Sequence, residues 1–193
     1  SDVRVEFVTS DIELFWRALD QSTPASMPAV LEREYLRQGS RGLAEFTRLR
    51  IGDGAQLAAV VQAHPAYYAA LRKSSRRVEE FKPVMRRAFQ CLRAIYPEAV
   101  MPTVTFVIGR MNSAGTVDAR NLLIGVDMFG KSDEAAMAGL GRWHRAVVAP
   151  IERLPYIVAH ELIHAQQTNA GGGTLLAAAE AAAERTLAGF RTP

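Results

Sequence analysis

The sequence predicts a mostly helical α+β protein with a small antiparallel sheet, and two observations carry that prediction. Apolar residues recur at helical spacing through most of the first half of the chain. Two short runs rich in β-branched and aliphatic residues, 103–108 and 121–126, then fit strands. From a length of 193 residues we expect a single domain, with a helical part over 1–98 and the strands and metal-binding helices over 99–193.

Turn residues divide the first half into helices. Ser10 and Glu13 match a capping box, and the apolar residues that follow share one helical face. Further helices are predicted over 29–38, 41–50 and 67–95, the last of them bent at Pro83.

The pattern changes at Pro97. We expect the two strands to form a β-hairpin whose long loop, 109–119, is rich in turn residues. A loop over 130–150 follows, and then a helix over 155–168. Three glycines separate that helix from a last, alanine-rich helix over 175–187.

Composition is that of an ordinary globular protein. Hydrophobic residues make up 49% and charged residues 22%, and Cys91, the single cysteine, excludes an intramolecular disulfide. No apolar run reaches the roughly 18 residues of a membrane span. The net charge is +3, with basic residues concentrated over 72–93. The basic residues over 72–93 predict a solvated helix face. Nucleic-acid binding is the alternative, although no nucleic-acid motif accompanies these residues.

The residues that carry chemistry form the segment His160-Glu161-Leu162-Ile163-His164. Histidines four positions apart on a helix lie on one face, where both can bind a single Zn²⁺. Glu161 stands beside the first ligand, where it can take a proton from zinc-activated water as general base. Uncharged residues surround the motif and no proline interrupts it. The segment therefore predicts a zinc-dependent hydrolase, a metallopeptidase that cleaves peptide bonds.

A catalytic zinc needs a third protein ligand, which we expect from the last helix. Glu180 and Glu184 share one face of that helix, and the glycine turn before it lets the chain reverse. We predict Glu180 as the ligand and Glu184 as the acceptor of a hydrogen bond from a ligand histidine. Glu184 and His144 are the alternatives for the third ligand.

Two parts of the site stay open at this point. The sequence does not identify the group that stabilises the oxyanion, for which the candidates are Tyr67, Arg110, His144 and Tyr156. Extended peptide can pair with an edge strand of the sheet, which we expect at 103–109 or 121–126.

Three segments resemble a family of bacterial predicted zinc-dependent proteases that is related to the gliding-motility lipoproteins. They are 106–116 (FVIGRMNSAGT), 123–125 (LIG) and 157–167 (IVAHELIHAQQ). The GRMNS portion discriminates best, because many peptidases share the metal motif. In that family the third ligand lies in a Glu-Gly-x-Ala-Asp type of segment. Glu180 and Glu184 match its outer carboxylates, with Glu184 standing in place of the aspartate.

The resemblance implies export to the periplasm, the medium or a lipid-anchored position. A cytoplasmic location is the alternative. From the metal motif we also predict a gluzincin-like core and a peptide or protein substrate. The rival function is a non-catalytic, zinc-containing binding or scaffold protein of the cell envelope, which a closed four-coordinate zinc would indicate.

Overall fold

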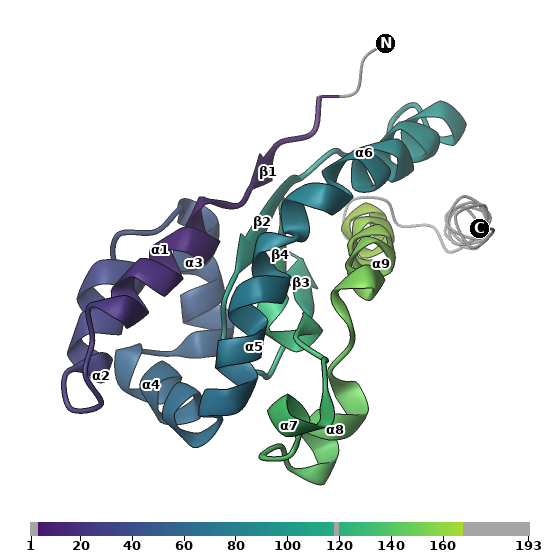
Figure 1. The fold of residues 1–193 in the computed structure, drawn as a ribbon. Coiled ribbons are helices and arrows are strands. Elements are labelled where there is room, and N and C mark those ends of the chain that lie inside the picture. The colour runs from purple at the N-terminus through teal and green to yellow at the C-terminus, as the bar shows by residue number, and fades with distance from the viewer. Residues whose placement is uncertain (1–3, 118–119, 168–193) are drawn as a thin grey trace.

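The computed structural model describes residues 4–117 and 120–167, and it shows a mostly helical α+β fold around a four-stranded mixed sheet (Figure 1). The predicted mostly helical α+β class is therefore confirmed, although the sheet is mixed and not antiparallel. The α-helices of this part are α1 Ser10–Asp20, α2 Met27–Val30, α3 Arg41–Phe46, α4 Gly54–Ala63, α5 Pro65–Arg76, α6 Val78–Ile95, α7 Glu134–Met137, α8 Arg142–Val147 and α9 Leu154–Gln167. Its strands are β1 Phe7–Val8, β2 Thr103–Val107, β3 Gly115–Val117 and β4 Asn121–Gly125.

Short helical segments extend this framework. The π-helical turns η1 (Leu31–Leu36) and η2 (Thr47–Ile51) continue α2 and α3, so the helices predicted over 29–38 and 41–50 are both present. The predicted loop over 130–150 in fact contains α7 and α8, and the 3-10 helices η3 (Val126–Phe129) and η4 (Ile151–Arg153) adjoin it.

Two predictions about the first half are wrong in detail. The segment 67–95 forms two helices that part at Arg77, whereas Pro83 lies inside α6 without ending it. Ser10 is the first residue of α1 and not its cap, because Thr9 occupies the N-cap position. The hydroxyl of Thr9 donates to Glu79 Oε1 of α6 at 2.7 Å, and the Thr9 side chain makes no capping hydrogen bond to α1.

The sheet differs from the predicted antiparallel hairpin. Its strand order is β1-β2-β4-β3, and β2 pairs with β4 in parallel over its full length. The antiparallel partner of β4 is β3, a short strand inside the predicted 109–119 loop, with Gly115 opposite Ile124. Parallel strands cannot be joined by a tight hairpin turn, because the chain must return to the starting end of the sheet. β3 lies within the segment that makes this return between β2 and β4. Both predicted strands are thus inner strands, and β3 is an edge.

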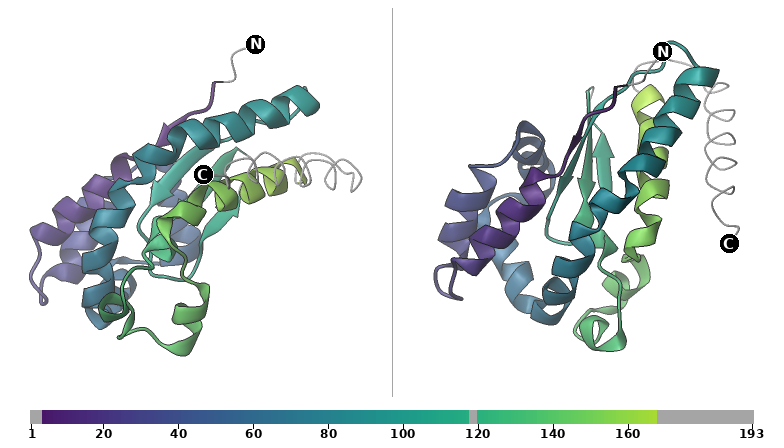
Figure 2. Two further views of the ribbon diagram at one scale, coloured as in Figure 1. Left: turned by 45° about the vertical axis from the view of Figure 1, so that its right-hand side comes forward. Right: turned by 45° about the horizontal axis from the view of Figure 1, so that its top comes forward.

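Helices cover both faces of the sheet (Figure 2). α1 and α3 pack on one face, and α9 lies beside α6 on the other. Side chains alternate between faces, so Phe106 and Ile124 share the α9 face with Gly115. On the opposite face, Gly42 of α3 leaves room for Thr105, because a Cβ added at Gly42 would lie 2.6 Å from Cβ of Thr105. The core fills both interlayer spaces and places α9 against the edge strand β3.

Candidate metal centre

Helix α9 carries the predicted zinc motif and is anchored firmly to the fold. One face is apolar and buried, including Leu154, Val158 and Leu162. Pro155 is accommodated because it lies in the first turn, where no intrahelical N–H is needed. Near the other end, buried Gln166 accepts from the Val100 N–H at 2.7 Å and donates to the Val100 carbonyl at 2.9 Å. These bonds fix the rotation of α9 and leave its opposite face toward solvent.

The two predicted histidine ligands converge on that opposite face. The Nε2 atoms of His160 and His164 are 2.8 Å apart, and the ring centroids lie 4.5 Å apart with the ring planes at 84°. His160 is exposed and His164 half-buried. This contact is a hydrogen bond between the two imidazoles, and it places both Nε2 atoms on the same face of α9.

A neighbouring amide selects the tautomer of the second histidine. Nδ1 of His164 lies 2.6 Å from Oε1 of Gln167, and an amide oxygen only accepts hydrogen bonds. The proton of a neutral His164 therefore sits on Nδ1, and the lone pair of Nε2 accepts the hydrogen bond from Nε2 of His160. Ligand histidines in metal sites are held by just such an outer hydrogen bond. Gln167 thus occupies, toward His164, the role that we predicted for Glu184.

These donors fit zinc. Zn–N distances of about 2.0–2.1 Å in a tetrahedral site place two ligand nitrogens about 3.3 Å apart. The observed separation of 2.8 Å between the Nε2 atoms of His160 and His164 is within half an ångström of that value. A small side-chain rotation accommodates the difference, and the backbone of α9 need not move.

Glu161 lies against the edge strand of the sheet. A Cβ built on Gly115 of β3 would come within 2.8 Å of Cγ and 2.9 Å of Cδ of Glu161. Only a glycine at this position lets the Glu161 side chain lie so close to β3. Sequence reasoning treated Gly115 as a turn residue and missed this contact. The β-branched pair Thr116 and Val117 directly after it was the available signal for a strand.

The third ligand is outside the part of the chain that can be examined. Glu180 and Glu184, and the helix predicted over 175–187, lie beyond the described residues. Among residues 4–117 and 120–167, no group of three or more His, Cys, Asp or Glu side chains is placed to hold a metal. His144 is not grouped with the α9 histidines, because its Nε2 lies 3.1 Å from the Met111 carbonyl oxygen.

The GRMNS segment that connects β2 to β3 is held by a buried carboxylate. Asp127 accepts from the Gly109 N–H at 2.6 Å and from the Met111 N–H at 2.7 Å. Burial raises the pKa of Asp127 to about 6, against the lowering effect of these two donors. Met111 adopts a φ of +59°. The hydrogen bonds from the Gly109 and Met111 N–H groups to Asp127 help to hold the backbone in this conformation. Sequence reasoning missed Asp127, although a lone carboxylate in the apolar run after β4 needs a partner.

Most candidates for oxyanion stabilisation are engaged elsewhere. The Tyr67 hydroxyl donates to the Asp127 carbonyl at 2.7 Å, and Arg110 Nε donates to the Arg50 carbonyl at 2.9 Å. Tyr156 is the candidate that shares α9 with the motif, one turn before His160. Its ring lies 4.6 Å from the Arg153 guanidinium carbon.

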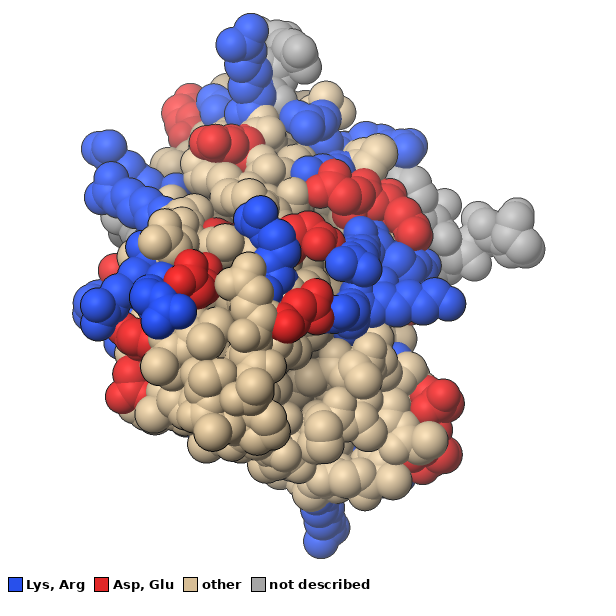
Figure 3. All heavy atoms as spheres, turned by 60° about the vertical axis from the view of Figure 1, so that its left-hand side comes forward, with Lys and Arg blue, Asp and Glu red and all other residues tan. Residues whose placement is uncertain are grey.

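The basic residues over 72–93 belong to a network of opposite charges. Several of them pair with carboxylates of other or neighbouring turns: Arg72 with Asp20, Arg76 with Glu13, Arg77 with Glu80 and Glu152, and Lys82 with Glu79. On the face shown in Figure 3, Lys and Arg side chains alternate with Asp and Glu, and an uncharged expanse lies below them. Ion pairs of this kind are what the predicted solvated helix face requires.

No family model, curated protein or solved structure matches this chain. The family resemblance therefore rests on the three segments quoted above. In the part of the chain that the structure describes, no helix combines the length and apolar character that crossing a bilayer requires.

Proposed function

We propose that this protein is a zinc-dependent hydrolase that cleaves peptide bonds. The observation that carries the proposal is a single arrangement on α9. The Nε2 atoms of His160 and His164 lie 2.8 Å apart, and the Glu161 side chain packs against Gly115 of the edge strand β3. Two neutral imidazoles, a carboxylate and an open, solvent-facing side are the requirements of a hydrolytic zinc site.

His160 and His164 would hold the metal, and a carboxylate from the segment after α9, with Glu180 as the first choice, would complete the set. Bound zinc supplies Lewis acidity and makes water a nucleophile near neutral pH. Gln167 keeps His164 in the tautomer whose Nε2 can bind a cation.

Glu161 performs the proton transfers in this proposal. Its carboxylate accepts the proton of the attacking water and later delivers it to the nitrogen of the leaving amine. Because Gly115 has no Cβ, the Glu161 carboxylate can lie close beside β3. The scissile bond of an extended substrate would lie there. Anchoring of α9 through Gln166 limits the positional freedom of all three motif side chains.

The edge strand supports a peptide as the substrate class. β3 pairs with β4 on one side, and no strand within the described residues pairs with its other side. A peptide added there gains backbone hydrogen bonds that do not depend on its sequence. This replaces the expectation that 103–109 or 121–126 would be the edge, since both are inner strands. A gluzincin-like core, in which the third ligand is a glutamate on the following helix, is part of the same proposal.

The test is to compare Glu161→Gln with the wild-type chain after zinc loading. We expect both proteins to bind about one zinc per chain, while hydrolysis of a denatured protein such as casein falls by roughly 10²–10⁴-fold in the variant. A chain that binds no zinc would contradict the proposal. Equal turnover in both proteins, or zinc without any hydrolysis in the wild type, would instead favour a scaffold with a closed zinc site.

A further inference from the structure

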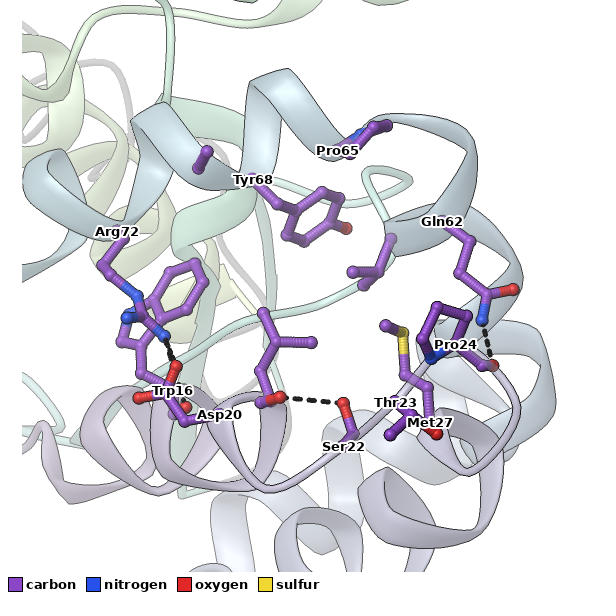
Figure 4. Close-up of a pocket in the computed structure, with 13 residues that line it drawn as sticks. Trp16, Asp20, Ser22, Thr23, Pro24, Met27, Gln62, Pro65, Tyr68 and Arg72 are labelled. Atoms are coloured by element: carbon purple, nitrogen blue, oxygen red, sulfur yellow. Dashed lines mark hydrogen bonds and ion pairs between the residues drawn. The ribbon is translucent and has the colours of Figure 1, made fainter.

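A groove on the helical side of the molecule, distinct from α9, has the size of a small-molecule site. It encloses about 770 Å³ and lies between α1, the segment that joins α1 to α2, α4 and α5 (Figure 4). Ligand sites of drug-sized molecules occupy roughly 300–1,000 Å³ and are mostly apolar with a few fixed polar groups. The volume of the groove is therefore within the range of small-molecule sites.

The floor of the groove is apolar and rigid. Trp16, Tyr68 and Val61 form a packed base that is almost fully buried, and Leu19, Met27 and Pro65 supply the apolar surface that solvent reaches. The indole of Trp16 is fixed by its Nε1–H, which donates to Ser75 Oγ at 3.0 Å. The Tyr68 ring, labelled in Figure 4, is almost fully buried, and its hydroxyl donates to the Gly109 carbonyl at 2.7 Å. An apolar body laid along this floor would remove hydrocarbon surface from water on both partners.

One end of the groove presents a cation with spare donors. Arg72 stacks over Trp16, its guanidinium carbon 5.1 Å from the ring centroid. Nη2 of Arg72 is directed at Asp20 and at the Trp16 carbonyl. Nε and Nη1 of Arg72 make no hydrogen bond to any residue that the structure describes. A planar guanidinium with two donors left is matched by a carboxylate.

The opposite end of the groove carries no charge. The Gln62 amide donates to the Pro24 carbonyl at 2.6 Å, and Thr23 and Ser26 bond to one another. Figure 4 places Gln62 and Pro24 at the end away from Arg72 and Asp20. The polar groups at this end satisfy each other, so a ligand needs no polar group there.

We propose that this groove binds a medium-chain fatty acid or an equivalent amphiphile with one carboxylate. The carboxylate lies on Nε and Nη1 of Arg72, which bond to no described residue, and the chain extends past Leu19 toward Met27. This site shares no residue with the metal centre and does not depend on the proposed hydrolase activity.

The experiment is calorimetric titration of the full chain with decanoate and, in parallel, with decanol. We expect saturable binding of decanoate. Arg72→Gln weakens it by roughly tenfold or more, the usual effect of losing a charge-assisted bond, and leaves decanol binding unchanged. Arg76→Gln is the matched control, because Arg76 lies one turn along α5 and pairs with Glu13 outside the groove.

A second pair of variants locates the ligand. Ala69 is exposed and lines the groove, so Ala69→Phe fills the groove without disturbing the core and abolishes binding of both compounds. In the Trp143→Phe variant, Trp16 is the remaining tryptophan. We expect decanoate to shift the emission maximum of Trp16, and the dissociation constant from this fluorescence titration to equal the one measured by calorimetry. Circular dichroism confirms that each variant is folded. The proposal is overturned if decanoate does not bind, if Arg72→Gln binds it as wild type does, or if Ala69→Phe retains binding.

Discussion

The four histidines of the chain form two pairs with similar T-shaped ring contacts, but the ring nitrogens of the two pairs have different partners. His160 and His164 lie one turn apart on α9, with their Nε2 atoms 2.8 Å apart on the solvent side. His64 and His144 are 80 positions apart, and their ring centroids lie 5.6 Å apart at an interplanar angle of 69°. In the second pair, Nε2 of His144 lies 3.1 Å from the Met111 carbonyl oxygen.

The difference teaches that the positions of the nitrogen atoms, and not the proximity of the rings, decide which pair is a candidate for metal binding. On α9 the helical repeat brings both Nε2 atoms to one point, and Gln167 holds the proton of His164 on the far nitrogen. In the other pair, Nδ1 of His64 is buried without a hydrogen bond to any described residue. We interpret that pair as packing between α8, the loop after α4 and the GRMNS segment.

The largest effect expected is the loss of zinc from the first pair. His160→Ala removes one of two converging nitrogens and should lower zinc affinity by more than roughly a hundredfold, since even outer-shell losses cost 10–100-fold. His144→Ala, the control from the second pair, should bind about one zinc per chain, the same amount that we expect for the wild type. Elemental analysis after dialysis measures both. Equal zinc content in the two variants would erase the distinction between the pairs.

The next effect concerns the surroundings of the second pair and appears as a pH dependence of stability. The pKa of Asp127 is about 6 in the folded protein against an ordinary value of 3.8, so the folded state binds this proton more tightly than the unfolded state. The stabilising contribution is full below pH 3.8 and is lost as the pH rises through about 6. A shift of this size corresponds to about 3 kcal/mol of unfolding free energy.

Asp127→Asn removes the titrating group, so urea unfolding between pH 4 and 7 should show this decline in wild type and not in the variant. The control is Asp53→Asn. The N–H of Gln56 lowers the pKa of exposed Asp53, and its contribution therefore has the opposite sign, lost as the pH falls. Parallel pH profiles for wild type and Asp127→Asn would contradict this account of the carboxylate.

A smaller effect sharpens the description of the first pair. Gln167→Ala removes the acceptor at 2.6 Å from Nδ1 of His164 and frees the ring to change tautomer. We expect zinc affinity to fall by roughly tenfold, at the lower end of outer-shell effects. Gln90→Ala, an exposed glutamine on α6, is the matched control in the same competition titration. An unchanged affinity in Gln167→Ala would show that another group orients His164.

The smallest effect tests the contact between the motif and the edge strand. Gly115→Ala places a methyl group within 3 Å of Glu161 and should displace its carboxylate. We expect turnover to fall by about tenfold with zinc content unchanged, because a misplaced general base loses part of its contribution. Gly139→Ala is the control, since a Cβ there meets no atom within 4 Å. If Gly115→Ala turned over substrate at the wild-type rate, Gly115 would have no role in positioning the Glu161 carboxylate.

Sequence reasoning reached the parts of this protein that depend on local spacing. The α9 histidines could be placed together because a helix repeats every 3.6 residues, whatever surrounds it. The helices over 29–38 and 41–50 followed from apolar periodicity and from glycines such as Gly52, whose φ is +89°. These features are determined within one or two turns of chain.

The rest depends on contacts between distant segments, which spacing alone does not reveal. The parallel pairing of β2 with β4 required knowing that β3 intervenes, and a strand of three residues carries little signal. Asp127, Gln166 and Gly115 act through partners 16, 66 and 46 positions away, at Met111, Val100 and Glu161 respectively. The Glu180 prediction stays open, since that residue lies outside the described part of the chain.

The most direct test of the central claim is a zinc titration followed by ¹⁵N NMR of histidine side chains in the full-length chain. With four histidines, each ring can be assigned by single substitution. The account predicts that Nε2 of His160 and of His164 shift together and saturate at one equivalent, while the rings of His64 and His144 stay unchanged. Zinc that shifts none of the four rings, or all four alike, would contradict it.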